Sequence, residues 1–148
     1  MIRTLVVAAS LVIGATAVVA QADAIAKRKE MLKAFGEAAK PVAAFLKGEA
    51  PYDLAKISAS IKTYVDTSNE FATNFDKHFP ANSKTGGDTA AGPKIWDDSK
   101  GFVAIWKQLN TDATAAMAQV QDQAAVKGAL GKMMGNCKTC HDDYRIKK

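Results

Sequence analysis

Cysteine is scarce in this 148-residue chain, which has only Cys137 and Cys140. A disulfide between them would close a very small loop and would constrain the unfolded chain little. A structural zinc site prefers four nitrogen or sulfur ligands, and the chain offers only these thiols, His141 and the distant His78. Global stability and zinc are therefore poor explanations for the cysteine pair, and a local chemical role is favoured.

Long apolar runs are also absent. The first twenty residues, MIRTLVVAASLVIGATAVVA, carry one charge at Arg3 and continue with an apolar stretch that polar residues and glycine interrupt. The stretch falls short of the roughly 20 apolar residues of a membrane-spanning helix, and it ends in small residues that suit a signal peptidase. We predict that residues 1–20 are a cleaved signal peptide and that residues 21–148 form one soluble domain. A retained N-terminal anchor is the alternative.

Charge of one sign is nowhere concentrated. Lysine and arginine together number 20 against 15 acidic residues, and the formal net charge of +5 falls to +4 when Arg3 is removed with the signal peptide. The lysines are scattered among acidic residues, which is typical of a solvated surface with a mild positive bias. We therefore expect no nucleic-acid binding. An acidic redox partner is compatible with this charge.

The sequence lacks the periodicity of β-strands. No window alternates apolar and polar residues with β-branched enrichment, whereas the helix formers alanine, lysine, leucine and glutamine dominate. Proline and glycine divide the chain into four amphipathic segments, at about residues 23–47, 54–75, 95–120 and 126–144, with a long crossover loop at 79–93. The other connections are short, which predicts an all-α, antiparallel up-and-down four-helix bundle.

The motif CKTCH at residues 137–141 carries the most specific chemistry. On a helix, Cys137, Cys140 and His141 project over neighbouring parts of one surface. A redox-active dithiol is expected in a βαβ context, which this sequence lacks. The spacing C-x-x-C-H is instead the attachment signal for c-type haem, in which the thiols bond the haem vinyl groups and the histidine ligates iron. We predict one covalent haem c per chain.

Several stretches of the mature chain resemble the bacterial cytochrome c′ family. They are an A-x-x-x-R-x-x-x-L pattern at residues 24–32, KGEAPYD at 47–53, TGGD at 85–88, PKIW at 93–96 and CKTCHDDYR at 137–145. The resemblance implies a periplasmic homodimer with the haem in the core of the bundle. This five-coordinate, high-spin haem would bind nitric oxide and carbon monoxide or exchange electrons with an unidentified redox partner. No acid–base pair or substrate pocket is legible, so we do not predict an enzyme.

The residue that faces the haem from the first helix decides the coordination state. Counting back from KGEAPYD, the resemblance puts Leu32 there, and leucine cannot ligate iron. A pocket without hydrogen-bond donors on that side would disfavour oxygen. A slip of one residue, about 100° around the helix, would bring in Met31 as a sixth ligand and give a low-spin electron-transfer cytochrome.

The same resemblance assigns three charged residues to the site. Arg28 interrupts the apolar stripe, and a haem propionate would partner this buried cation; a surface arginine is the alternative. Asp88 matches a position at the haem periphery, but it also suits a turn after two glycines. Arg145, one helical turn after His141, would be a cation of the proximal pocket or a charge that complements the helix dipole. His78 is expected to be exposed.

Overall fold

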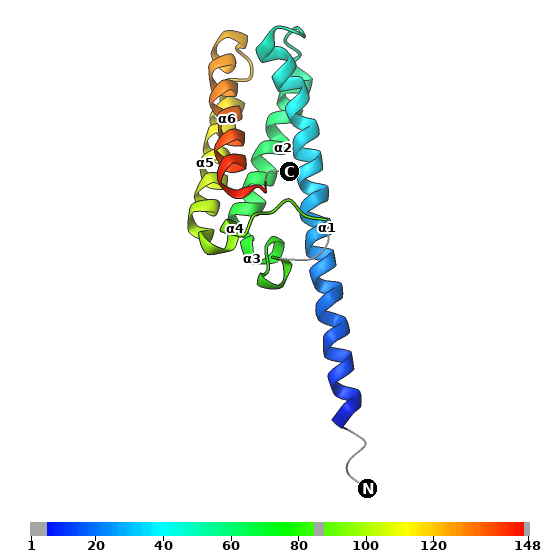
Figure 1. Ribbon diagram of the computed structural model, residues 1–148. Helices are drawn as coiled ribbons and strands as arrows, with labels where there is room; N and C mark the ends of the chain where they lie inside the picture. Colours follow the sequence, from blue (N-terminus) through cyan, green and yellow to red (C-terminus); the bar gives the residue numbers. More distant parts are fainter. Residues whose placement is uncertain (1–5, 85–87, 147–148) are drawn as a thin grey trace.

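The computed structural model describes residues 6–84 and 88–146, with side chains described from residue 21 onward. Its elements, in chain order, are α1 (Val6–Lys47), α2 (Leu54–Thr73), α3 (Phe75–His78), the 3-10 turn η1 (Ala81–Ser83), α4 (Lys94–Asp97), α5 (Ser99–Ala118) and α6 (Gln123–Tyr144). The long helices α1, α2, α5 and α6 run alternately up and down (Figure 1). The predicted all-α, antiparallel four-helix bundle is confirmed.

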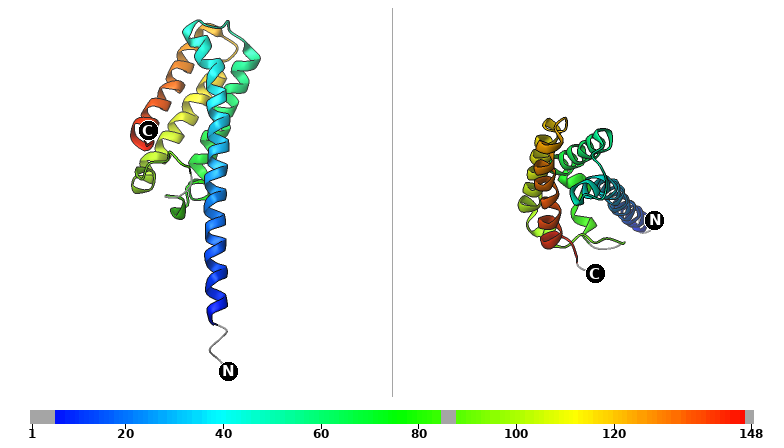
Figure 2. Two further views of the ribbon diagram at one scale, coloured as in Figure 1. Left: turned by 45° about the vertical axis from the view of Figure 1, so that its right-hand side comes forward. Right: turned by 90° about the horizontal axis from the view of Figure 1, so that it is seen from above.

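Helix α1 is longer than the predicted first segment. It begins at Val6 and runs unbroken through the predicted cleavage point, and its N-terminal part extends away from the bundle (Figure 2). It ends at Lys47 because Gly48 adopts a positive φ of 75° and its N–H bonds to the Phe45 carbonyl. Among the described residues, no helix is both long and apolar enough to cross a membrane. The signal peptide stays a prediction.

Two of the predicted helices are interrupted beside the crossover loop of residues 79–93, called the crossover segment from here on. The second ends at Thr73, because Asn74 leaves the helical region (φ −119°, ψ 42°) before the short α3 begins. The third is divided into α4 and α5 at Asp98, whose carboxylate accepts a hydrogen bond from the Gly101 N–H and so caps α5. Both breaks correct the sequence prediction of continuous helices.

His78 is buried, so the expectation that it is exposed is wrong. Its side chain is 2% exposed, its ring centre lies 5.1 Å from that of Phe71, and its Nε2 is 2.8 Å from a Glu70 carboxylate oxygen. The histidine is carried inward because α3 packs against both α1 and α2. Hydrogen bonds from His78 and Lys77 lower the pKa of Glu70 to about 2.

The core is built from the apolar stripes of all four long helices. Val42, Ile61, Leu109 and Leu130, one from each helix, are at most 4% exposed. Burying a side chain of this size contributes about 1.5–3 kcal/mol. Next to the crossover segment the core becomes aromatic, with edge-to-face contacts among Phe71, Phe79, Phe102 and Trp106.

Candidate functional site

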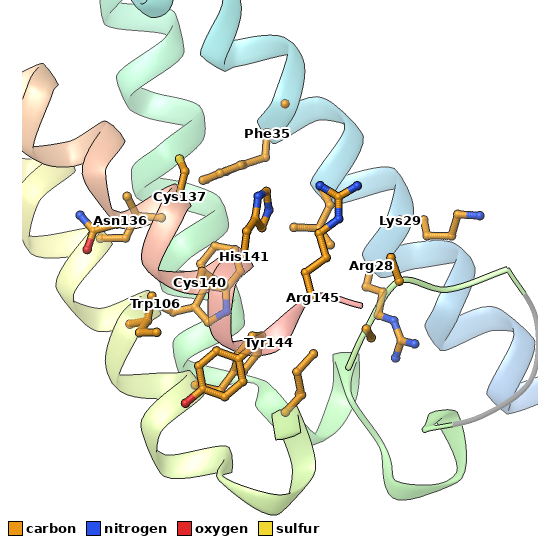
Figure 3. Close-up of a pocket in the computed structure, with 18 of the residues that line it drawn as sticks. Arg28, Lys29, Phe35, Trp106, Asn136, Cys137, Cys140, His141, Tyr144 and Arg145 are labelled. Atoms are coloured by element: carbon orange, nitrogen blue, oxygen red, sulfur yellow. The ribbon is translucent and has the colours of Figure 1, made fainter. Parts of the chain in front are cut away.

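A cavity of about 700 Å³ lies between α1, α2, α5 and α6, and residues 88–91 also line it. Volumes of this size are usual for small-molecule and cofactor sites. Most of the lining from α1, α2 and α5 is apolar, whereas α6 contributes the two cysteines and His141 (Figure 3). The predicted attachment motif therefore faces a cavity large enough to hold a cofactor.

Helix α6 places all three motif residues on the cavity wall. The helix begins after Asp122, whose carboxylate accepts hydrogen bonds from two backbone N–H groups of the first turn. The side chains of Cys137 and Cys140 are half-buried, and burial raises the pKa of both thiols, that of Cys140 to about 11. Burial and the neighbouring Arg145 lower the pKa of His141, which favours the neutral imidazole that ligates metals.

The pKa values of these side chains help to distinguish the three candidate uses of the motif: a redox pair, a zinc site and a haem attachment site. A redox-active cysteine acts as a thiolate and usually has a lowered pKa. Here the thiol pKa values are raised, and the described residues form no group of three or more histidine, cysteine or acidic side chains that could hold a metal ion. Two neutral thiols and a neutral imidazole on an apolar cavity fit the attachment and axial ligation of haem c.

Helix α1 lines the cavity with Leu32 and not with Met31. Leu32 is 39% exposed, because its side chain faces the cavity rather than a neighbouring helix. Met31 is partly buried against the hydrophobic core instead. Phe35, three residues after Leu32, extends the same wall. Counting back from KGEAPYD assigned the position facing the haem to Leu32, and Leu32 is indeed the one of the two neighbours on the cavity side of α1.

Arg28 also lines the cavity, and it is a buried arginine rather than a surface one. Its side chain is 1% exposed, and its guanidinium donates to Ser83 Oγ at 2.8 Å, to the Ser83 carbonyl at 3.1 Å and to Thr89 Oγ1 at 3.0 Å. It also lies over the rings of Phe79 and Trp96. None of these partners carries a charge, and burial lowers the pKa of Arg28. An anionic group in the cavity would therefore be a favourable further partner.

The hydrogen bonds of Arg28 tie the crossover segment to α1. Replacing Arg28 with lysine is expected to lower the free energy of unfolding by about 2 kcal/mol, because one ammonium group cannot span the oxygens that a guanidinium fork reaches. Urea unfolding of the haem-containing protein, followed by circular dichroism, measures the change. Lys29→Gln is the matched control, because it removes only an exposed ion pair with Asp88 and should change stability much less. Equal losses in the two variants would contradict this role.

Asp88 lies on the cavity lining at the edge of α1. One of its carboxylate oxygens is 2.9 Å from Lys29 Nζ, which gives the crossover segment a second link to α1. The other residues of the TGGD motif, 85–87, lie outside the described residues. Both roles assigned to Asp88, contact with the haem periphery and turn formation, stay predictions.

Arg145 lines the cavity, but not from the helix that carries His141. Helix α6 ends at Tyr144, and Arg145 is extended (φ −103°, ψ 134°) in an isolated antiparallel bridge with Ala91. The bridge requires glycine at position 92, because a Cβ on Gly92 would lie 2.9 Å from the Tyr144 carbonyl oxygen. The helical placement of Arg145 is therefore wrong, although its charge still lowers the pKa of His141.

Two polar groups in the cavity wall were missed by the sequence analysis. Tyr64 is fully buried, and its hydroxyl donates to the Met134 sulfur at 3.4 Å. Trp106 lines the cavity from α5. The only available signal was an aromatic residue with a polar atom at a core position. The expectation that the Leu32 side of the haem lacks hydrogen-bond donors stays a prediction. His78 does not line the cavity.

The fold and the cavity together define a class of protein. A four-helix bundle whose C-x-x-C-H motif faces an apolar cavity is a c-type haem protein. A family model for Cytochrome C' matches residues 23–145. The chain belongs to the cytochrome c′ family, and it carries haem c covalently through Cys137 and Cys140, as the motif predicted.

Individual relatives agree with this assignment. Cytochrome c′ from Rhodopseudomonas palustris is 47% identical over 147 residues, which cover 99% of this chain and 98% of its own. A solved structure of that protein has a TM-score of 0.77 at 49% identity, covering 85% of this chain and 98% of its own. Cytochrome c-556 from Agrobacterium tumefaciens is 40% identical over 122 residues, 82% of this chain and 93% of its own.

A more distant relative has been solved with a gas bound. It is the nitric oxide complex of a leucine-to-alanine variant of cytochrome c prime from Alcaligenes xylosoxidans. Its identity to this chain is 28% and the TM-score is 0.70, covering 86% of this chain and 97% of its own.

Proposed function

We propose that the protein is a five-coordinate, high-spin haem protein that binds small neutral gases, nitric oxide and carbon monoxide, on the haem face opposite His141. The observation that carries this proposal is that Leu32 on α1 lines the cavity whereas the adjacent Met31 does not. A leucine side chain offers iron no ligand atom, so that face is left for an exogenous molecule. The nitric oxide complex of the Alcaligenes xylosoxidans relative supports this ligand class.

Different residues of the cavity would attach the haem, ligate its iron and neutralise its propionates. Bound haem supplies the iron that binds the gas. Cys137 and Cys140 would fix the group to α6, and His141, whose pKa is lowered by burial, would supply a nitrogen that ligates the iron. Arg28 and Arg145 bring positive charge to the same cavity, where they would neutralise the haem propionates.

The alternative is a low-spin electron-transfer cytochrome with Met31 as the sixth ligand. To bring the Met31 sulfur into the cavity, α1 would have to rotate by about 100°. That rotation would move Arg28 away from Ser83 and Thr89 and would withdraw Leu32 from the cavity. The observed contacts therefore favour the five-coordinate protein.

Absorption spectra distinguish these two functions. The purified ferrous protein is expected to show a broad high-spin Soret band and to change to a sharp band when carbon monoxide is added, because one axial position is free for the gas. Sharp low-spin α and β bands in the untreated ferrous protein, with no response to carbon monoxide, would contradict the proposal. That result would favour the six-coordinate alternative.

We also propose that residues 1–20 direct export and that the mature domain acts in the periplasm. The layout of the N-terminus supports export, and so does covalent haem attachment, which in bacteria takes place outside the cytoplasm. The homodimer and the unidentified redox partner stay predictions of the family resemblance. We propose a gas-binding role and assign no catalytic reaction.

A further inference from the structure

Gly36 lies on the cavity wall one helical turn after Leu32. Both residues line the cavity from α1, and positions four apart on a helix lie on the same face. Glycine inside a helix is less stable than alanine, because it loses more backbone freedom on folding and has no side chain to pack. A glycine at this position of the wall therefore calls for a reason.

The contacts of the chain supply neither of the usual reasons for glycine at this position. Gly48 has the positive φ of 75° that favours glycine, whereas Gly36 has an ordinary helical backbone. A Cβ on Gly92 would lie 2.9 Å from the Tyr144 carbonyl oxygen. A Cβ on Gly36 would meet no atom of the described residues within 4 Å outside its own stretch of helix. The space that a side chain would occupy there is therefore open to the cavity.

Gly36 and Leu32 differ from the other α1 residues on this wall, most of which are engaged elsewhere. Arg28 is bonded to the crossover segment. The ring centres of Phe35 and Tyr64 are 4.2 Å apart, and Phe35 is partly buried against the core. Of the uncharged residues that α1 contributes, Leu32 and Gly36 are the two left exposed on the cavity side. They therefore border the part of the cavity that lies nearest to α1.

The direction of helical side chains connects the open space at position 36 with Leu32. Side chains on a helix tilt toward its N-terminus, so a side chain at position 36 would extend over the turn that carries Leu32. With glycine at that position, the Leu32 side chain has an unfilled space beside it on the cavity wall. A diatomic gas needs only a small gap of this kind between the iron and the helix, whereas a larger ligand needs more room.

We infer that Gly36 sets the size of the ligand that the haem accepts: the space left by its missing side chain, beside Leu32, receives the outer atom of the bound gas. Gly36 is then a specificity-determining residue, because steric access on this side of a haem helps to decide which ligands bind. Leu32 and Gly36 act in opposite directions, since one fills the ligand space and the other leaves it open. This inference rests on the proposed function, since it requires an exogenous ligand on the α1 side of the haem.

Gly36→Ala tests the inference, because it adds one methyl group to the wall and alanine favours the helix. Association of carbon monoxide with the ferrous variant, followed by stopped-flow mixing at the Soret band, should slow by about fivefold or more, the factor expected for overpacking a filled site. Ethyl isocyanide, a larger ligand of ferrous haem, should be slowed more than carbon monoxide. In a Leu32→Ala background, Gly36→Ala should slow carbon monoxide much less, because the two residues border one space.

Gly131→Ala is the matched control. Gly131 lies inside α6 but not on the cavity lining, and a Cβ there would also meet no atom of the described residues within 4 Å outside its own stretch of helix. In urea unfolding of the haem-containing protein, neither glycine-to-alanine variant should lower the midpoint, and only Gly36→Ala should change the association rates.

Two results would overturn the inference. They are unaltered association rates in Gly36→Ala, or equal slowing of carbon monoxide and ethyl isocyanide. Unaltered rates with a lower urea midpoint would show that the haem ring itself, and not the gas, fills the space beside Leu32. Carbon monoxide binding by the unaltered protein tests the proposed function separately. If the gas binds and Gly36→Ala has no effect on its rate, only the inference fails, whereas failure of the gas to bind would overturn both.

Discussion

A variant in which Cys137 and Cys140 are both replaced by alanine is expected to lose all haem to acidified acetone, whereas the unaltered protein should retain it. Acid protonates the axial imidazole and unfolds the cavity, so only covalent bonds hold the group afterwards. The two thiols are the only cysteines in the chain, and both face the cavity. The absorbance of haem in the acetone phase and in the precipitated protein measures how much haem is extracted and how much stays bonded to the protein.

Single variants provide the control for this experiment. Cys137→Ala and Cys140→Ala each keep one thiol on the cavity wall, so each should retain haem in the precipitate through one remaining bond. Because both side chains are only half-buried, truncation to alanine should disturb the bundle little. Retention of haem by the double variant would contradict the attachment through this motif.

The four-helix bundle was predictable because its signals are local. Apolar stripes with helical spacing and the breakers between them are properties of short windows, and they located the C-terminal end of α1 correctly. The misplaced boundaries depend on single residues. Asn74 ends α2 and Asp98 divides α4 from α5, and both residues are also common within or beside helices, so the pattern alone does not identify them as breaks.

The attachment motif was predictable for a similar reason, since C-x-x-C-H is contiguous in sequence. The environment of Arg28 was not, because its partner Ser83 lies 55 residues away and is brought close only when the crossover segment folds against α1. Arg145 was misplaced because a bridge to Ala91, on that same segment, ends the helix before it. Helical periodicity cannot report such long-range contacts.

The rotation of α1 about its axis determines whether Met31 or Leu32 faces the cavity. Adjacent helical residues point about 100° apart, so only one of Met31 and Leu32 can face the cavity. The fold selects Leu32 because Arg28, one turn earlier on the same face, is fixed by its bonds to the crossover segment. The buried arginine therefore helps determine which of the two neighbours faces the cavity.

Leu32→Ala is expected to raise the affinity of the ferrous protein for carbon monoxide and nitric oxide by about 5- to 150-fold. Accommodating a ligand against a packed side chain typically costs about 1–3 kcal/mol, and truncation at Leu32 removes most of that cost. The gain should appear mainly as faster association, measured by stopped-flow mixing with carbon monoxide and followed at the Soret band.

Met31→Ala is the matched control, because it shortens the neighbouring side chain on the same helix but outside the cavity lining. It should lower stability, since Met31 packs against the core, and it should leave the association rate unchanged. A larger acceleration in Met31→Ala than in Leu32→Ala would mean that α1 presents the other neighbour to the iron. Equal, unaltered rates in both variants would mean that neither side chain covers the ligand site, and the five-coordinate proposal would lose the observation that carries it.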